Sequence, residues 1–356
     1  MFRYYTGCRR KWVYFILKST YYGSVGLGLF PFTFNSKLKR LQRSKWLIAY
    51  GLALNFSLIG LTLFLNGARE NILWMDIYIR NPSVKYIEII GGVFSVLTAC
   101  VIHLKTFWNN QKLLTILNKL LVLEFMHFGN QSHGECPKFE YFVIQKFIFI
   151  ALDIILFSPL LSVMHFHLIA ICIYRYVWII NAELLDLKQR MNSSRVRLLL
   201  QLYGQLIDIN DLLTDTYDYQ MTLYLGTVLT ANIIISFIFI IFWTRLLNPK
   251  TIIISVMFSL ALVIKFSDFW LAITICDQAE KTARETSTIL KLYNEINDLD
   301  VETEQILTEF SLFCSHRRLQ FFHCKLFAVN HQMGFQMLIT CVLYLIFLVQ
   351  FDYMNL

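Results

Sequence analysis

Long apolar stretches separated by short polar segments run through almost the whole 356-residue sequence, and they constrain its fold more than any other feature. A helix rises 1.5 Å per residue, so about 20 mainly apolar residues cross the roughly 30 Å of bilayer hydrocarbon. The sequence therefore predicts an all-α, polytopic membrane protein, one domain with seven transmembrane helices. The seven stretches are residues 46–65, 86–104, 141–163, 164–181, 221–243, 252–276 and 322–351.

The composition agrees with a membrane protein and excludes other classes. Hydrophobic residues make up 56% of the chain and charged residues only 16%, against about 45–50% and 25% in soluble domains. A chain this apolar is neither a water-soluble domain nor a disordered one. The third stretch adjoins the fourth directly, and Ser158 and Pro159 leave only a tight hairpin there, so a single re-entrant element is the alternative.

The basic residues predict the orientation of the chain. Of 32 lysines and arginines, 23 lie in alternate segments on the side of the amino terminus, five lie in the other segments, and four lie inside stretches. Because cytoplasmic segments carry the excess of basic residues, the amino terminus is predicted inside and the carboxyl terminus outside the cell. Basic residues that flank spans, with no dense basic stripe, predict a bilayer and no nucleic acid as the partner.

Three cytoplasmic segments are predicted to extend the spans as helices: residues 105–137, 182–220 and 277–321. Apolar residues recur there at three-to-four spacing, as in Leu202, Leu206 and Ile209, which is typical of an amphipathic helix that packs on a partner surface. Asp300 is predicted as the N-cap of a helix whose first turn holds Glu302 and Glu304. The alternative is that these segments are solvated connectors.

Signals of catalysis are missing. The sequence holds no glycine-rich phosphate loop, no G-x-S-x-G, no H-E-x-x-H and no C-x-x-C motif, so we predict no enzyme activity and no cofactor. Cys314, His316, His323 and Cys324 gather near the last stretch, but their spacing fits no common structural zinc pattern. We therefore predict no metal site.

Ionisable residues inside the stretches are costly in hydrocarbon and should face protein or water. Lys265 and Asp268, three residues apart on one helix, are predicted to form a local ion pair. Asp153 lies near the middle of the third stretch, and Arg175 either reaches toward it or extends to the inner membrane surface.

The last stretch carries polar residues on one face. Gln332, Gln336, Leu343 and Gln350 recur at intervals of 4, 7 and 7 residues, close to whole helical turns. A lipid-facing row of amides is penalised, so this face meets either other helices or water. A hydrogen-bonded seam between helices and a pore formed by several copies are both consistent with the pattern.

On the pore interpretation, residues near the outer end of this helix would form its gate. Tyr344, Phe347, Gln350 and Phe351 lie there, and apolar rings can close a pore by excluding water. Asp352 would then form an acidic ring that favours cations.

The chain end, Leu343-Tyr-Leu-Ile-Phe-Leu-Val-Gln-Phe351, resembles the signature of insect gustatory receptors: Thr-Tyr, five apolar residues and Gln-Phe. Tyr344, Gln350 and Phe351 match, whereas Leu343 replaces the usual threonine. Further matches extend over nearly the whole chain, and its beginning looks most like a fruit-fly bitter-taste clade. They are Gly28-Leu-Phe-Pro-Phe32, Tyr174-Arg-Tyr-Val-Trp178, Phe310-Ser-Leu312, His316-Arg317, and Leu326-Phe327 with Asn330.

The resemblance implies a tetrameric ligand-gated cation channel, homomeric or heteromeric, with seven spans, a cytoplasmic amino terminus and the last helix lining the pore. It also implies a multi-pass protein of the cell membrane, in the dendrites of gustatory receptor neurons, that mediates acceptance or avoidance. A metabotropic seven-helix receptor and a secondary transporter are the alternatives.

A tastant pocket between the second and sixth spans, open to the outside, is a further implication of the resemblance. The outer halves of these spans offer mainly apolar and aromatic walls suited to a hydrophobic small molecule. For any single one of these residues the alternative is an aromatic side chain that faces lipid or the core. The candidates are Phe157, His165, His167, Phe237, Phe242, Trp243 and Phe258.

Overall fold

The computed structural model describes residues 8–68, 82–128, 136, 138–153, 159–188, 192–241, 252–295 and 300–354, and most of these residues are helical. Its helices are α1 (Cys8–Gly26), α2 (Lys45–Ala68), α4 (Pro82–Trp108), α5 (Asn110–Leu123), α6 (Phe139–Asp153), α7 (Pro159–Leu187), α8 (Ser193–Ile241), α10 (Ile252–Lys291), α11 (Val301–His316) and α12 (His331–Met354). A π-helical turn, η2 (Glu124–Phe128), follows α5, and a 3₁₀ turn, η3 (Leu292–Glu295), follows α10. The strands are β1 (Phe32–Asn35), β2 (Arg40–Arg43), β3 (Phe322–His323) and β4 (Phe327–Ala328).

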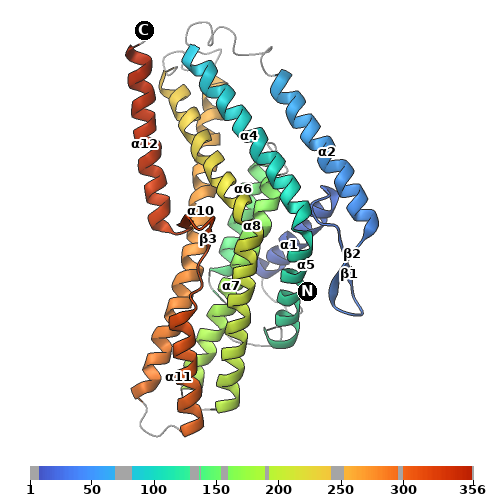
Figure 1. The fold of residues 1–356 in the computed structure, drawn as a ribbon, viewed down its shortest axis with the longest axis vertical. Coiled ribbons are helices and arrows are strands. Elements are labelled where there is room, and N and C mark those ends of the chain that lie inside the picture. The colour runs from blue at the N-terminus through green and yellow to red at the C-terminus, as the bar shows by residue number, and fades with distance from the viewer. Residues whose placement is uncertain are drawn as a thin grey trace.

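Two helices are much longer than a bilayer is thick. At 1.5 Å per residue, the 49 residues of α8 extend about 74 Å and the 40 residues of α10 about 60 Å. Figure 1 shows one end of both helices beside α11 and the other end beside α4 and α12. Within the described residues, five helices are long and apolar enough to cross a membrane: α4, α7, α8, α10 and α12.

The amphipathic helix predicted for residues 182–220 is present with a later start. Residues up to Leu187 belong to α7, and α8 begins at Ser193. Leu202, Leu206 and Leu213 are buried, as the spacing of apolar residues predicts. This face therefore packs on the protein and is not a solvated connector.

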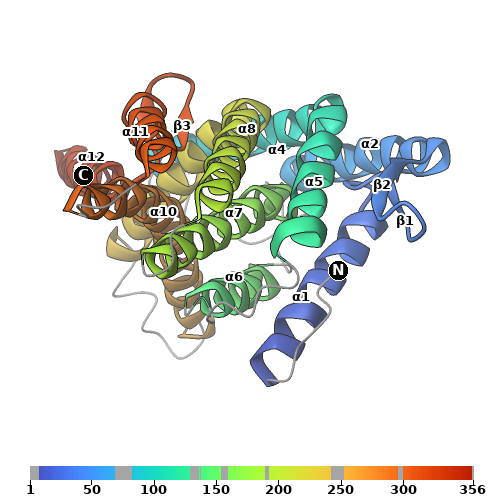
Figure 2. The same cartoon turned by 90° about the horizontal axis from the view of Figure 1, so that it is seen from below.

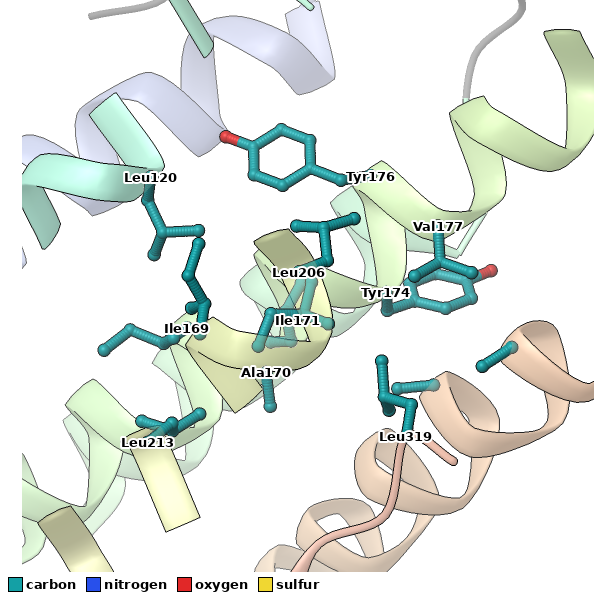
Figure 3. Packing of buried hydrophobic residues seen from close by; sticks show 14 of the residues in the cluster. Leu120, Ile169, Ala170, Ile171, Tyr174, Tyr176, Val177, Leu206, Leu213 and Leu319 are labelled. Atoms are coloured by element: carbon teal, nitrogen blue, oxygen red, sulfur yellow. The ribbon is translucent and has the colours of Figure 1, made fainter. Parts of the chain in front are cut away.

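Helix α7 occupies the centre of the bundle, with α6, α8 and α10 around it (Figure 2). Its side chains Ala170, Ile171 and Val177 are completely buried. Figure 3 shows them among Leu206 of α8 and Leu120 of α5, so residues far apart in the sequence share one core. Close packing of this kind resists changes of volume, which makes α7 a rigid axis for the other helices.

The boundary between the third and fourth spans differs from the predicted one. Helix α6 ends at Asp153, and α7 begins at Pro159 instead of residue 164. Proline fits the first turn of a helix because its missing amide needs no partner there. Residues 154–158, where the alternative of a single re-entrant element would be decided, lie outside the described residues.

An ion pair in the bundle joins two helices instead of lying within one. Lys146 of α6 binds Asp268 of α10 at 2.5 Å, and both side chains are almost completely buried. The hydroxyl of Tyr224 on α8 donates to the other Asp268 oxygen at 2.9 Å. The predicted local pair of Lys265 with Asp268 is therefore wrong, because a neighbouring helix offers Asp268 a fully buried cation.

Arg175 of α7 also has a partner that the sequence did not predict. Its guanidinium donates to Glu124 of η2 at 3.0 Å, and the hydroxyl of Tyr176 donates to the same carboxylate oxygen at 2.9 Å. The prediction considered Asp153 or the membrane surface as the target of Arg175. Glu124, whose burial the local sequence does not reveal, is thus a partner of Arg175, whereas the side chain of Asp153 is not among those described.

Candidate functional site

The segment that follows α1 carries one of the sequence motifs, Gly28 to Phe32. Gly28 has φ +68°, and a Cβ atom there would lie 2.6 Å from the Cα atom of Gly51 in α2. Only glycine allows both this backbone conformation and this approach. Phe30 and Phe32 are buried beside α1. The motif thus fixes the passage from α1 through the β1–β2 hairpin to α2.

Arg317 and Asn330, from two other motifs, likewise hold elements in place. Arg317 binds Asp208 at 2.7 Å and Asp211 at 2.6 Å and so ties the end of α11 to α8. Asn330 accepts a hydrogen bond at 3.0 Å from the Met333 amide, as an N-cap of α12 does. The family motifs therefore include residues that fix the segments before α12, as well as residues of α12 itself.

Asp300, the predicted N-cap, occupies the N-cap position of α11, and Glu302 and Glu304 lie in the first turn. Its side chain makes no capping hydrogen bond. The position of Asp300 therefore agrees with the prediction, but its side chain does not cap the helix.

A hairpin, and not a helix, forms the start of the last predicted stretch. Residues 322–328 fold into β3 and β4, and α12 begins at His331. Cys324 and Lys325 adopt positive φ in the turn. The amide of Cys324 donates to the carboxylate of Asp218 on α8, which fixes the hairpin to the bundle. The helical start predicted at residue 322 is thus wrong, because apolar content alone does not distinguish a buried hairpin from a helix.

His323 of β3 is completely buried next to this joint. Its Nδ1 atom lies 3.7 Å from Oδ1 of Asp218. Burial lowers the pKa of His323 to about 4, although Asp218 acts in the opposite direction. The ring is therefore neutral at physiological pH, and within the described residues no group of ligands that could hold a metal includes it.

Helix α12 combines high hydropathy with very little burial. Its apolar window has a mean hydropathy of 2.0, and 6% of that window is buried, compared with 1.6 and 78% for α7. Figure 1 shows α12 at the edge of the molecule, with the carboxyl terminus at its far end. Such an apolar surface needs lipid, partner helices or both around it.

The amide-bearing face of α12 points away from the rest of the chain. Positions 332, 336, 343 and 350 lie within about 40° of one another on a helix that turns 100° per residue, and all four are exposed. Gly334 and Cys341 lie on the opposite face, against the bundle. A seam between these glutamines and other helices of the same chain is therefore excluded among the described residues.

The residues predicted for the gate share this exposure. Leu343, Tyr344, Phe347 and Phe351 are 62%, 57%, 61% and 43% exposed. Phe347 and Phe351 stack with ring centres 6.4 Å apart. Asp352 belongs to α12, but its side chain is not among those described. The aromatic rings thus form an apolar band beside the glutamine face.

Contacts with α10 and α8 hold α12 on its inner face. A Cβ atom on Gly334 would lie 2.7 Å from Cδ1 of Ile273 on α10, so the two helices touch closely there. Farther along, Phe237 and Ile238 of α8 pack against apolar side chains of α12, which are Leu345, Leu348 and Val349.

The residues predicted for a tastant pocket do not gather around one cavity in the described part. His165 of α7 lies 2.7 Å from the Ser24 hydroxyl of α1, and His167 is completely buried in the core. Phe237 packs against α12. The side chain of Phe258 is not described, and Phe157, Phe242 and Trp243 lie outside the described residues.

Comparison with known proteins gives a consistent result. The family model described as 7tm chemosensory receptor matches residues 17–158 and 152–355. Gustatory receptor 22a of Drosophila melanogaster is 43% identical over 96% of this chain and 95% of its own length. The gustatory receptor for bitter taste 22e of the same species is 41% identical, over 99% of this chain and 98% of its own length.

Among solved structures, the insect olfactory receptor OR5 from Machilis hrabei, in complex with eugenol, has the same fold. It superposes with a TM-score of 0.66 at 13% sequence identity and covers 96% of this chain and 98% of its own. All these relatives are receptors, which agrees with the prediction that the chain is no enzyme.

Proposed function

Because the chain belongs to the 7tm chemosensory receptor family, we propose that it is a gustatory receptor, one subunit of a ligand-gated cation channel that detects bitter small molecules. The single observation that carries the channel is the outward-facing amide face of α12. A row of glutamines on an exposed apolar helix is stable only where it meets water or other amides.

Four copies around an axis would supply that environment. With α12 of each copy nearest the axis, Gln336, Leu343 and Gln350 line an aqueous path. Tyr344, Phe347 and Phe351 would close it by excluding water, and a ring of four Asp352 carboxylates would favour cations at its mouth. Binding of a tastant opens the path to the extent that it favours the open arrangement.

The orientation in the membrane follows from the basic residues. The amino terminus and the end of the bundle formed by α5, α11 and the lower parts of α8 and α10 lie in the cytoplasm, and the carboxyl terminus lies outside. Epitope tags at both ends test this on unpermeabilised cells. An accessible amino-terminal tag would contradict the orientation and favour a metabotropic receptor.

The ligand is proposed to be a small apolar molecule. One relative is named for bitter taste, and a protein of the same fold was solved with eugenol, a small aromatic compound. Phe157, His165, His167, Phe237, Phe242, Trp243 and Phe258 remain the proposed walls of its pocket. The proposed place of action is the dendrite of a gustatory receptor neuron.

Leu343 stands where the family signature has threonine, so this chain offers no hydroxyl to the path at that level. A partner subunit with the usual threonine would restore it. We therefore propose that the chain works best in a heterotetramer, and Leu343→Thr is expected to increase the currents of this chain expressed alone.

Electrophysiology on cells that express the chain, alone and with related subunits, tests the channel with a panel of bitter compounds. Gln350→Ala should change the conductance or the ion preference. Gln201→Ala, an exposed glutamine of α8 far from α12, serves as the matched control and should change neither. Unchanged currents in Gln350→Ala at normal surface expression would contradict the pore-lining role of α12.

A further inference from the structure

The segment that precedes the first predicted span carries positive charge without any negative charge. Residues 1–45 contain ten lysines and arginines and no aspartate or glutamate, and all 24 acidic residues lie farther along the chain. Seven of these basic side chains are described and exposed, and none of the seven forms an ion pair with another described residue. A group of unpaired positive charges in one segment indicates an anionic partner. The seven are Lys11, Lys18, Lys37, Lys39, Arg40, Arg43 and Lys45.

Helix α1 combines two of these lysines with aromatic rings on one face. Lys11, Phe15, Lys18 and Tyr22 lie within about 60° of one another on a helix that turns 100° per residue, and Phe15 and Tyr22 are 54% and 61% exposed. The ring of Trp12 lies edge-on to that of Phe15, with centres 5.9 Å apart. Nζ of Lys18 lies 6.0 Å from the centre of the Tyr22 ring. Lysines among exposed aromatic rings are typical of a helix that lies on a bilayer surface.

The opposite face of α1 packs on the protein. Val13 and Ile16 are almost completely buried, and the hydroxyl of Ser24 lies 2.7 Å from Nε2 of His165 on α7. Figure 2 shows α1 at the rim of the bundle, next to α6. The helix therefore has one face on the bundle and presents the face with Lys11 and Lys18 to its surroundings.

The β1–β2 hairpin and the start of α2 continue this surface. The hydroxyl of Tyr21 donates to the carbonyl of Phe32 in β1 at 3.0 Å, and that of Tyr50 in α2 donates to the carbonyl of Gly26 at 2.6 Å. Trp46, where the first predicted span begins, is 87% exposed, as is typical of an aromatic residue at a membrane interface. Figure 1 shows α1 and the hairpin beside this end of α2, so the basic side chains lie close to the level of the lipid headgroups.

The apolar side chains among the charges favour a lipid over a soluble anion. Leu38, between two lysines at the tip of the hairpin, is 60% exposed. A soluble anion would leave Leu38, Phe15 and Tyr22 in water. A phospholipid surface covers apolar side chains and supplies phosphates to the lysines. The cytoplasmic leaflet, where the proposed orientation places this segment, is the one rich in anionic lipids.

We propose that the exposed face of α1 and the β1–β2 hairpin form a docking surface for anionic phospholipid headgroups, which hold α1 against the inner leaflet. Because Ser24 contacts His165, lipid bound to α1 also stabilises the contact of α1 with α7. The assignment to the inner leaflet rests on the proposed orientation. The selection of anionic lipid depends neither on the orientation nor on the channel function.

Lipid selection can be measured without any current. The full chain, purified in detergent, is mixed with equal amounts of phosphatidylserine and phosphatidylcholine, and native mass spectrometry counts each lipid that stays bound. In 0.1 M ammonium acetate we expect a preference for phosphatidylserine of about tenfold or more, since each basic residue near an anionic surface contributes roughly fivefold. At 1 M salt the screening length falls from about 10 Å to about 3 Å, so most of this preference should be lost.

Two lysines of α1 test where the lipid binds. Lys11→Gln/Lys18→Gln should lower the preference by about fivefold or more, whereas Lys11→Arg/Lys18→Arg, which keeps both charges, should retain it. The matched control is Lys188→Gln/Lys291→Gln. It removes two exposed lysines where α7 and α10 end, at the lower end of the bundle in Figure 1, and should leave the preference unchanged.

Equal binding of the two lipids by the unaltered chain would overturn the proposal. An equal loss of preference in the α1 variant and in the control would assign the effect to overall charge and overturn it as well. Displacement of phosphatidylserine by an equal concentration of glycerophosphoserine, its headgroup without tails, would identify a site for soluble anions instead. A preference lost in the α1 variant alone, in a chain whose amino-terminal tag is accessible outside the cell, would support the surface while the proposed orientation fails.

Discussion

Helices α7 and α12 are similarly apolar, yet the chain uses them in opposite ways. Of the apolar window of α7, 78% is buried within the chain, and of that of α12, 6%. Hydropathy thus predicts that both cross the membrane but does not reveal what each one contacts. The core around α7 is complete within one copy, whereas α12 has a face whose partners this chain does not provide.

The largest effect on stability is expected at the buried ion pair of Lys146 with Asp268, in the core around α7. Lys146→Met leaves Asp268 buried with Tyr224 as its remaining partner described here, and an uncompensated buried charge costs about 3–5 kcal/mol of stability. Thermal unfolding of the detergent-solubilised chain should show a strong loss. The double variant Lys146→Met/Asp268→Leu should recover most of it, and a double variant as unstable as the single one would contradict this account.

A matched pair of substitutions compares the two helices directly. Ile171→Ala in α7 creates a cavity in a filled core and should cost about 2–5 kcal/mol. Leu343→Ala on the outer face of α12 removes a side chain that is 62% exposed and should change the stability of the isolated subunit by about 0.5 kcal/mol or less. Equal losses of melting temperature would show that α12 belongs to the core.

The contact of α12 with α10 can be broken at Gly334. Gly334→Leu inserts a side chain where a Cβ atom already lies 2.7 Å from Ile273, and overpacking of this kind costs about 1–3 kcal/mol. The displaced helix should also reduce ligand-evoked currents. In Gly60→Leu, the control, the new Cβ meets no atom within 4 Å, so stability and currents should stay close to those of the unaltered chain.

The buried His323 in the β3–β4 hairpin should make the stability of the chain sensitive to acid. Burial lowers the pKa of His323 to about 4, whereas histidine in the unfolded chain titrates near about 6.5. The unfolded state therefore binds the proton first as the pH falls, so stability is unaffected above about 6.5 and decreases toward pH 4. At pH 5 the expected loss is about 2 kcal/mol.

Melting curves between pH 7.5 and pH 5 measure this effect. His323→Gln, which cannot titrate, should lose less stability over that range than the unaltered chain. Identical pH dependence of the two proteins would assign the acid sensitivity to other groups.

The sequence predicted much of the membrane architecture because apolar length is a local property. The spacing of Leu202, Leu206 and Leu213 predicted a buried helical face, and the glutamine spacing predicted that one face of α12 is distinct. Family motifs also included residues that fix the connections between helices, such as Gly28 and Asn330. Periodicity did not reveal the β3–β4 hairpin, since it is short and apolar on both sides.

The sequence by itself determined that this chain enters a membrane, roughly where its long apolar helices lie and to which family it belongs, because these depend on composition, spacing and motif. Only the tertiary structure decided which buried charge meets which, as for Lys146 with Asp268 and Arg175 with Glu124, because a charge in an apolar bundle pairs with whichever partner the packing of distant helices brings near. The same packing decided that α7 is enclosed and that the glutamines of α12 face outward.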